Sequence, residues 1–591
     1  MEKNTVWAIV LSTLVLVVFS FLQIKFFPVE QVMPTEISSV EENITTKLLE
    51  DNSAMLSPTE DISEEEQIPE EHFVITTEKA KITFTNRGGD IIGYEFIDHK
   101  DGDVGVEMAE NIQSTNRAFA LAFGDASKEI INEIFAVKKI SDYSIGFYRT
   151  FQTTNSDGTT GSFVLAKQYT FKPDDYMFKL DITIDGQDAF SGLNFNNSAY
   201  TLRTSPQIGP YYDVNTDRYE YRKFMSYTDG KKKNATLSAG QTKVYNKDYS
   251  WTGVAGKYFE IIGIPQNSMV MQDVLYSCAI EEGESPNSQV MMTRGSIDSK
   301  YTTDTYYFYV GPRTEQDLKI YNKSEDNPWG LSGLKLNDSL ESTGLLYWLE
   351  AFLKWCLVLI HKIIPNWGIA IIVLTIFIKI LLYPITKKST LSTLKMQEVQ
   401  PRMQEIQTKY KDQPEKMNME LAKLYKETGY NPLSGCLPLL IQFPLIFAMY
   451  NLFNNYFEFR GAMFIPGWIP DLSKGDSVYT LSFNLPFNLG NQIRLLPFIY
   501  VVSQIVFSKI TQTASTGANG MQMKIIMYVM PVMFFFIFYN APAGLLIYWT
   551  VSNALQLVQQ VILNRIMKAK REEMEQNKGP EKKVFVPKKK K

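Results

Sequence analysis

The fold is decided by residues 363–384, which read IIPNWGIAIIVLTIFIKILLYP and carry a single charge, at Lys379. An α-helix rises 1.5 Å per residue, so about 20 apolar residues cross the ~30 Å hydrocarbon core of a bilayer. Such a segment must be helical, because an open strand would leave its backbone polar groups unsatisfied in lipid. We therefore expect a transmembrane helix, whose apolar run ends at Tyr383-Pro384.

Further uncharged runs predict the remaining spans, at residues 4–24, 428–457, 495–508 and 525–564. The last run is too long for one span and contains the turn-forming cluster Asn540-Ala541-Pro542-Ala543-Gly544, so we expect a helical hairpin there. The total is six spans. The run at 4–24 is either an uncleaved anchor or a signal peptide. Its length and the lack of a small-x-small cleavage site favour the anchor.

The charges divide the chain into two halves. The 591 residues carry 59 Lys and Arg against 64 Asp and Glu, yet residues 342–591 alone hold 28 basic and 14 acidic residues. Nine of the basic residues lie in the segment 385–427 and ten follow Arg565, whereas the segment 458–494 contains three. By the positive-inside rule, 385–427 and both termini are cytoplasmic, and residues 26–340 and 458–494 lie outside.

Residues 72–320 have the texture of an all-β domain. Short runs rich in Thr, Val, Ile, Tyr and Phe alternate with turn formers such as Arg87-Gly88-Gly89-Asp90 and Thr228-Asp229-Gly230. Without long intervening helices, this spacing predicts a two-sheet sandwich. Its many Asp and Tyr side chains either cover plain sheet surface and hairpin tips or line a sugar-binding cleft. The preceding stretch, 30–71, holds 13 acidic residues and one lysine and is typical of a solvated spacer.

The sequence carries no motif for an enzymatic reaction. It has no phosphate-binding G-x-x-x-x-G-K-[ST] loop, no H-E-x-x-H and no G-x-S-x-G. The three histidines and three cysteines are scattered, without the paired spacing of a zinc site or the arrangement of a disulfide framework. We therefore expect a protein that is not an enzyme and that has neither a metal site nor another cofactor.

Lys379 is the unusual residue of the membrane half. A lysine in mid-membrane costs about 2.5–3.5 kcal/mol on insertion scales, so it normally faces water or a partner. The other five spans contain no Asp or Glu that could pair with it. Lys379 either snorkels toward the surface or lies in a wet cavity that attracts an anionic group. The spans supply ten polar side chains of the kind that such a cavity needs: Thr375, Gln442, Asn451, Ser503, Gln504, Thr550, Ser552, Asn553, Gln556 and Gln560. Of the residues on other spans, we expect Gln442, Gln504 and Ser552 to line it.

The loop 385–427 carries two apolar stripes at helical spacing, separated at Pro414, which predict a hairpin of two amphipathic helices. The stripes either pack on each other or dock a nascent chain. The residues expected to make these contacts are Met403, Ile406, Met417 and Leu421. Residues 344–360, rich in Leu and Trp, predict an interfacial amphipathic helix on the outer face. The lysine-rich tail suits anionic lipid or ribosomal RNA.

Four motifs resemble the YidC family of membrane-protein insertases: TNRGGD at 85–90, TIFIKILLYP at 375–384, YNPLSGCLPLLIQ at 430–442 and PAGLLIYWTVSN at 542–553. The first is similar to the start of the family's periplasmic domain and the others to its second span, its third span and its last hairpin. The resemblance covers nearly the whole chain. Its membrane motifs are specific, while residues 100–320 match weakly.

The resemblance implies a bacterial inner-membrane protein with a periplasmic β-super-sandwich between the first and second spans. It also implies a five-helix core around a hydrophilic groove that opens to the cytoplasm and to lipid. The family's groove charge is usually an arginine. Lys379 takes the matching position here, which keeps the charge and loses the planar fork. By the same match, Thr375 and Trp549 would line the groove or the substrate path.

We therefore expect a membrane protein insertase and chaperone that helps newly made proteins to insert, fold and assemble in the inner membrane. The expected partners are nascent membrane proteins, the Sec translocon, the lipid bilayer and, through the basic tail and cytoplasmic loops, the ribosome. One alternative is an assembly factor whose periplasmic domain acts as a chaperone and whose spans serve as an anchor. A second is a solute transporter, although no internal repeat relates 363–457 to 495–564.

The expected division of the chain has six parts. These are an N-terminal anchor span at 1–25, an acidic flexible linker at 26–71, the periplasmic β-sandwich at 72–320, a linker with the interfacial helix at 321–362, the insertase core at 363–565 with its cytoplasmic hairpin at 385–427, and a basic cytoplasmic tail at 566–591.

Overall fold

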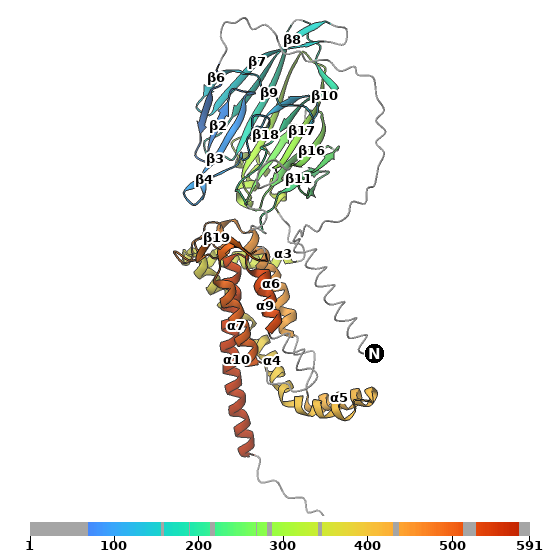
Figure 1. The fold of residues 1–591 in the computed structure, drawn as a ribbon, viewed down its shortest axis with the longest axis vertical. Helices are drawn as coiled ribbons and strands as arrows, with labels where there is room; N and C mark the ends of the chain where they lie inside the picture. Colours follow the sequence, from blue (N-terminus) through green and yellow to red (C-terminus); the bar gives the residue numbers. More distant parts are fainter. Residues whose placement is uncertain are drawn as a thin grey trace, which may run out of the picture. The chain divides into compact units, whose positions relative to one another are not determined.

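The computed structural model describes residues 69–154, 159–187, 189–212, 219–246, 248–266, 269–279, 287–340, 346–429, 437–487, 489–511 and 528–577. The expected first span at 4–24 and nearly all of the expected acidic linker lie outside these residues. The described chain consists of a β domain, which is followed in sequence by a set of helices (Figure 1).

The strands of the β domain form because apolar and polar residues alternate along them. In β8 (Thr160–Thr170) every second residue is buried, from Gly161 through Phe163 to Tyr169, as expected for a strand with one face on a core. The turn predicted at 228–230 joins β11 (Lys223–Thr228) to β12 (Lys231–Ala235). Asp229 and Gly230 both have left-handed backbones, with φ of 53° and 71°, which is the geometry of a two-residue hairpin.

The strands pair antiparallel in three sheets. The nine-stranded sheet contains, in spatial order, β12, β11, β14 (Trp251–Ala255), β15 (Phe259–Pro265), β18 (Tyr301–Pro312), β9 (Met177–Gln187), β8, β7 (Ser144–Thr154) and β6 (Ala136–Ser141). The five-stranded sheet contains β13 (Gln241–Tyr245), β16 (Met271–Ala279), β17 (Asn287–Ile297), β10 (Leu193–Arg203) and β5 (Leu121–Phe123). The four-stranded sheet contains β1 (His72–Thr76), β2 (Ala80–Thr85), β3 (Asp90–Asp101) and β4 (Val104–Glu107).

One aromatic core joins the three sheets. The ring of Phe178 on β9 lies 6.4 Å from the ring of Tyr94 on β3 and 5.1 Å from that of Phe119, which precedes β5. All three side chains are buried. Edge-to-face and tilted contacts of this kind add to the free energy gained from burial alone. The prediction of a predominantly β domain is therefore confirmed, whereas its described strands form three sheets and not the two that we expected.

Several charged side chains enter this core in pairs. The carboxylate of Asp90 is fully buried and contacts Lys167 Nζ at 2.5 Å and Arg117 Nε at 2.9 Å. Asp90 follows the predicted turn, in which Gly88 and Gly89 adopt φ of 68° and 62°. The Nζ of Lys167 also donates to the carbonyls of Gly88 and Phe119. A buried charge is tolerated here because opposite charges and hydrogen bonds surround it.

The second half of the described chain is helical. A short helix, α2 (Glu315–Lys319), and 3-10 turns at Ile320–Asn322, Ser324–Asp326 and Leu336–Ser339 follow the last strand. The longer helices are α3 (Tyr347–Ile363), α4 (Trp367–Lys409), α5 (Pro414–Thr428), α6 (Leu437–Asn455), α7 (Leu496–Thr511), α9 (Met530–Phe538) and α10 (Ala543–Asn577). Between α6 and α7 lie a 3-10 turn (Phe457–Phe459) and the two-stranded hairpin of β19 (Tyr479–Leu485) and β20 (Gly490–Ile493).

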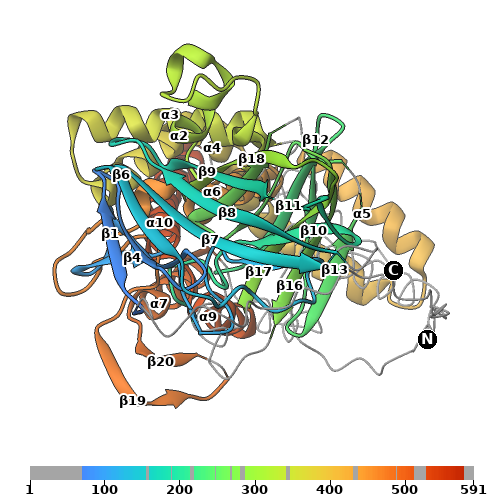
Figure 2. The same ribbon diagram turned by 90° about the horizontal axis from the view of Figure 1, so that it is seen from above.

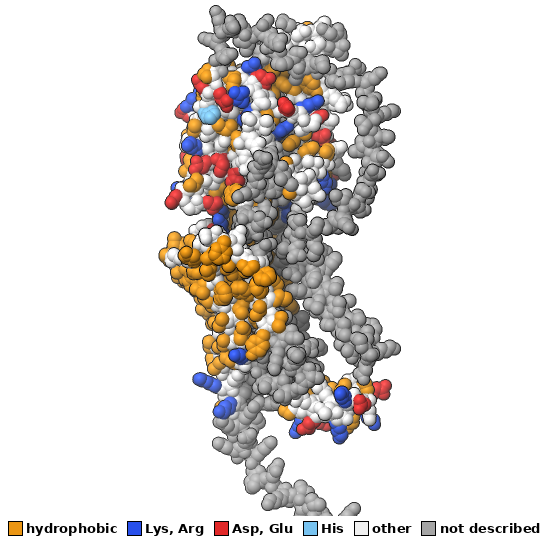
Figure 3. All heavy atoms as spheres, viewed as in Figure 1, with side chains coloured by type: hydrophobic (Ala, Val, Ile, Leu, Met, Phe, Trp, Pro, Cys, Tyr) orange, Lys and Arg blue, Asp and Glu red, His pale blue; other side chains and the backbone are white. Residues whose placement is uncertain are grey.

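Helix α10 packs against α4, α6 and α7. Leu374, Met449 and Tyr548 are among the buried side chains between them. The outward faces of the helices are apolar. Ile380 is 68% exposed, Val502 60% and Phe498 49%, and hydrophobic side chains cover the visible side of the helices (Figure 3). An apolar exterior of this extent is typical of a surface in contact with lipid.

The number of membrane spans stays a prediction. Within the described residues, Trp367–Lys387 is long and apolar enough to cross a membrane, with a mean hydropathy of 2.4, and Leu496–Ile510 is apolar but shorter. The hairpin predicted within 525–564 corresponds to α9 and α10, which are joined by a turn at residues 539–542. The part of 525–564 that precedes residue 528 lies outside the described residues.

Helix α4 does not end with the apolar run at Tyr383-Pro384. Helix α4 continues through Pro384 and Pro401 to Lys409, so the first helix of the expected cytoplasmic hairpin is continuous with the span. A proline removes one hydrogen bond of the helix. Contacts with α10 on both sides of Pro384 hold the helix on its course: Lys379 binds Gln556 and Thr386 binds Gln559.

Two other boundaries differ from the sequence expectation. Thr428 is the last residue of α5, which Gly429 ends with a left-handed φ of 61°. The expected span therefore does not begin at residue 428, where the uncharged run begins. Glycine in this left-handed conformation commonly ends a helix, and the next described helix, α6, begins at Leu437. At the other end, α10 runs to Asn577 and so crosses the expected boundary between core and tail at 565 and 566.

Candidate functional site

A row of polar side chains on α10 faces the neighbouring helices. Asn553 Nδ2 donates to Ser503 Oγ of α7 at 3.1 Å. Gln556 Oε1 accepts from Lys379 Nζ of α4 at 3.4 Å, and Gln559 Nε2 donates to Thr386 Oγ1 of α4 at 3.1 Å. We call Lys379, Thr386, Ser503, Asn553, Gln556 and Gln559 the polar seam. Its α10 members are spaced by three residues, so they lie on neighbouring faces of one helix.

Lys379 is the cation of the polar seam. Its side chain is half-buried, and its hydrogen bond to Gln556 is long. No carboxylate in the described part of the chain forms an ion pair with it. An amide oxygen can orient an ammonium group, but it carries no net charge and cannot neutralise it. The ammonium group therefore retains its attraction for an anionic group that comes near.

Trp549 and Ser552 lie on α10 before the seam residues. Trp549 is 8% exposed, and its ring packs 4.5 Å from Phe538 of α9 and 5.7 Å from Tyr500 of α7. The hydroxyls of Ser552 and its neighbour Thr550 are buried and have no hydrogen-bond partner among the described residues. A hydroxyl left unpaired in a dry interior is costly, so both positions are suited to contact with water.

Among the described residues, the other predicted groove residues form no hydrogen bond with the polar seam. The hydrogen bonds of Thr375 and Gln504 lie within their own helices. Thr375 is fully buried, one turn before Lys379, and its hydroxyl donates to the carbonyl of Ile371 at 2.7 Å. Gln504 Nε2 donates to the hydroxyl of Tyr500 at 3.2 Å. Gln442 is half-buried on α6, a helix that contacts both α4 and α10. The six predicted residues thus occupy four helices of one bundle.

Sequence reasoning named Asn553 and Gln556 among the polar candidates without choosing them as site residues, and it did not name Gln559. The signal that could have found them is their three-residue spacing on a long, mostly apolar helix. A polar residue in such a helix is most often a contact between helices. The seam contains both this kind of contact, at Asn553 and Ser503, and the contact of Gln556 with a charged group.

The predicted cytoplasmic hairpin is formed by the second half of α4 and by α5. Met403 and Ile406 on α4 and Met417 and Leu421 on α5 are half-buried, and the two helices contact each other. Proline at the first position of α5 fits the predicted break at Pro414. These four side chains are therefore partly covered, while Met419 is 66% exposed.

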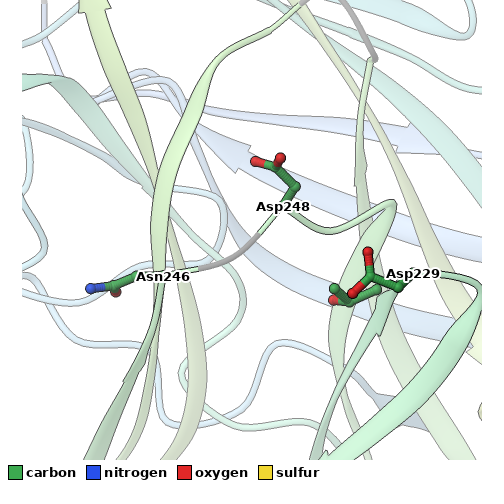
Figure 4. Close-up of a pocket in the computed structure, with 4 residues that line it drawn as sticks. Asp229, Asn246 and Asp248 are labelled. Atoms are coloured by element: carbon green, nitrogen blue, oxygen red, sulfur yellow. The ribbon is translucent and has the colours of Figure 1, made fainter.

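A polar pocket of about 330 Å³ lies in the β domain, at the turn between β11 and β12. It is lined by Thr228, Asp229, Asn246 and Asp248. The side chain of Asn246 points away from the carboxylate of Asp229 (Figure 4). The polar groups that line this pocket do not converge on one point, whereas those of a typical binding site do. No group of three or more His, Cys, Asp or Glu side chains within the described residues could hold a metal ion.

Family models match both parts of the chain. The YidC periplasmic domain matches residues 72–356, and the 60Kd inner membrane protein matches residues 359–571. Together they define a class: membrane proteins of the bacterial inner membrane that combine a helical membrane core with a periplasmic β domain. The polar seam lies in the second of these matched regions.

Relatives that match this chain along nearly its full length identify the family within this class. The chain is 45% identical over 585 residues to the membrane protein insertase YidC of Treponema denticola, which covers 96% of this chain and 100% of that protein. It is 42% identical to the insertase of Treponema pallidum, over 96% of this chain and 99% of that one. The chain therefore belongs to the YidC family of membrane protein insertases, and its function is the insertion of proteins into the membrane.

A solved structure of an active YidC insertase, with its first transmembrane domain resolved, is also similar, at 19% identity over 93% of this chain and 98% of that chain, with a TM-score of 0.34. The prediction of an insertase is confirmed by the curated relatives. Because the relatives are insertases, the prediction that the protein is not an enzyme is confirmed as well.

Proposed function

We propose that the polar seam is the path along which the hydrophilic part of a substrate crosses the membrane core. An acidic or polar segment next to a nascent span enters between α4, α7 and α10, and Lys379 holds it transiently. The adjoining apolar segment moves along the outer faces of the helices into lipid. Removing about 20 apolar residues from water supplies the driving force, so no energy-yielding reaction is required.

The single observation that supports this path most strongly is the state of Lys379. It is a cation among polar side chains, with an amide as its described partner and no described carboxylate near enough to pair with it. The unpaired hydroxyls of Thr550 and Ser552 provide further room for polar contacts. The membrane potential adds about 2.3 kcal/mol per charge per 100 mV, which favours outward movement of an acidic segment.

We propose the following topology. The loop 385–427 and both termini are cytoplasmic, and the β domain and the segment 458–494 are periplasmic, in agreement with the distribution of Lys and Arg. The six spans and the six-part division given above belong to this proposal. The cytoplasmic hairpin and the basic tail are the proposed contacts with the ribosome, because clustered lysines attract phosphate backbones regardless of sequence. The Sec translocon is the proposed partner for substrates with several spans.

Charge replacement at Lys379 tests the path. The insertion of single-span substrates with acidic, neutral and basic outer segments is measured in proteoliposomes with an imposed potential. We expect Lys379→Arg to insert all three normally, because the sign of the charge is kept. We expect Lys379→Glu to insert the acidic substrate at least about tenfold more slowly, equivalent to ~1.4 kcal/mol, and the neutral substrate within about twofold of normal.

Lys387→Glu is the matched control. This residue lies two turns further along α4, is exposed, and undergoes the same charge reversal. It should leave the acidic substrate within about twofold of the normal rate. Equal insertion of the acidic substrate by the Lys379→Glu variant and the unchanged protein would contradict the proposal. Equal losses with both variants would contradict it too, because they would point to surface charge.

A deletion separates the membrane core from the β domain. Removing residues 75–320 while keeping 340–591 should leave insertion of single-span substrates intact, since the polar seam is contained in the second part. A loss of insertion that is restored by adding the β domain in trans would favour the periplasmic chaperone as the functional unit.

A further inference from the structure

The hairpin β19–β20 presents an exposed apolar edge. The segment 477–493 contains no charged residue. Along β19, apolar Tyr479, Leu481 and Phe483 alternate with polar Thr480 and Ser482. Tyr479 is 64% exposed and Phe483 61%. A soluble hairpin would bury such a face, and an isolated two-stranded hairpin is marginally stable in water.

The base of the hairpin is fixed rigidly to the helices. Asp476, immediately before it, is fully buried, and its Oδ2 accepts from the backbone N–H groups of Leu495 and Leu496 at 2.7 and 3.0 Å. These are the residues at which α7 begins. Trp468 Nε1 donates to the same oxygen at 2.8 Å. The carboxylate therefore ties the segment to the first turn of α7, where an acidic group is favoured by the unpaired N–H groups of the helix.

The second strand is fixed to the turn between α9 and α10. The hydroxyl of Tyr539 donates to the carbonyl of Gln492 at 2.8 Å, and the guanidinium of Arg494 donates through Nε to Asn540 Oδ1 at 3.0 Å. The hairpin thus lies beside α7 and α9 (Figure 2). The exposed aromatic side chains are held in a defined place at the end of the helices.

The apolar edge adjoins the outward face of α9. Phe487, in the turn of the hairpin, is 76% exposed and lies with its ring 5.5 Å from that of Phe536 on α9. Phe536 itself is 40% exposed, as are its neighbours Val532 (48%) and Met533 (47%). The surface that meets lipid on the helices therefore extends without interruption onto the hairpin.

We propose that the β19–β20 hairpin is a membrane anchor whose aromatic edge lies in the interface between lipid headgroups and acyl chains. Tyr and Phe at the end of a membrane helix suit this layer, because a ring is stabilised by acyl chains while a tyrosine hydroxyl stays with water and headgroups. The polar face, with Thr480 and Ser482, remains in water. The side of the membrane follows from the proposed topology and is periplasmic, but the depth of the hairpin does not depend on that topology.

The test places an environment-sensitive fluorescent amino acid at position 483 of the full chain, in nanodiscs that hold one copy. Position 482 is the matched control, because Ser482 is the exposed polar neighbour of Phe483 in the same strand. We expect the probe at 483 to emit at shorter wavelength and to be quenched at least about threefold more strongly by lipids spin-labelled near the headgroup than the probe at 482. Iodide in solution should show the opposite preference.

Equal quenching of both probes by iodide, without quenching by lipid, would overturn the proposal. Protection of the probe at 483 from iodide and from spin-labelled lipid would overturn it as well, because a protein surface would then cover the edge. The same measurement in nanodiscs that hold two copies identifies the covering protein. If the probe is protected only in these discs, a second copy of this chain covers the edge. Insertion activity of each probe variant, measured first, shows that the labelled chains are folded and that the outcome concerns the hairpin and not the polar seam.

Discussion

The β domain and the helical bundle place charge and apolar surface in opposite ways. In the β domain an aromatic core lies inside, and the fully buried charge of Asp90 is paired with Lys167 and Arg117. In the bundle, large apolar side chains such as Val502 are outside, and the cation Lys379 has a neutral amide as its described partner. The contrast teaches that the surroundings differ, with water around the first region and lipid around the second. The proposed substrate path makes use of the incomplete pairing inside the bundle.

The largest effect is expected from breaking a complete charge pair. Asp90→Ala leaves Lys167 and Arg117 buried without their anion, and removing one partner of a buried pair costs about 3–5 kcal/mol. The β domain of the full chain should therefore melt at a markedly lower temperature. The measurement is thermal unfolding in nanodiscs, monitored by near-ultraviolet circular dichroism. Asp142→Ala, at an exposed pair with Lys139, is the control and should change stability by less than about 0.5 kcal/mol.

The next effect compares two exposed valines. Val502 on α7 is 60% exposed and Val244 on β13 is 50% exposed. An aspartate at the centre of a membrane helix costs about 2.5–3.5 kcal/mol, whereas surface substitutions in water usually stay within about 0.5 kcal/mol. We expect Val502→Asp to reduce the amount of folded protein in membranes severalfold and Val244→Asp to leave it unchanged. Equal yields of the two variants would contradict a lipid environment for α7.

A smaller effect concerns pH and the β domain. Burial raises the pKa of the Glu110 carboxyl to about 7, and the positive charge of Arg222 only partly opposes this. The folded state then binds a proton more tightly than the unfolded state, so this group lowers stability as pH rises from about 4.5 to about 7. The change should amount to about 1–3 kcal/mol, since one pKa unit corresponds to ~1.4 kcal/mol and the group is partly solvated.

Glu110→Gln should remove this part of the pH dependence and raise the melting temperature of the β domain at pH 8. The measurement is thermal unfolding of the full chain at a series of pH values. A slope that is unchanged by Glu110→Gln would assign the pH dependence to other groups. Glu129→Gln, at an exposed position before β6, is the matched control.

The smallest effect is expected at Ser552. Its buried hydroxyl has no described partner, so Ser552→Ala should change the stability of the bundle by less than about 0.5 kcal/mol. Ser144→Ala in the β domain removes a buried hydroxyl that donates to the carbonyl of Tyr169 at 3.0 Å. That change should cost about 1 kcal/mol. A larger loss at Ser552 than at Ser144 would show that the bundle holds its polar groups as completely as the β domain does.

Much of the fold could be predicted from local patterns. The hairpin at Asp229-Gly230 and the turn near Pro542 follow from residues whose backbone preferences act within a few positions. Continuation of α4 through Pro384 could not be predicted this way, because it depends on contacts with Gln556 and Gln559, more than 170 residues later in the chain. The role of Asp476 was missed for the same reason.

The sequence predicted that the site is polar and contains a cation, but it predicted less well which residues form it. A lone lysine in an apolar span singles itself out by the free energy needed to bury it, whereas Gln442, Gln504 and Thr375 were chosen because they are polar. Polarity alone does not say which neighbour a side chain meets. Thr375 in fact bonds to its own helix, and the described partner of Lys379 is a glutamine that sequence reasoning listed but did not choose.

The unbroken course of α4 has a mechanical consequence. Lys379 and Lys409 belong to one helix, and 30 residues at 1.5 Å each separate them by about 45 Å. A rod of that length pivoting by 10° swings its far tip by about 8 Å. A displacement of the far end of α4 therefore reaches the backbone of Lys379 through one continuous helix.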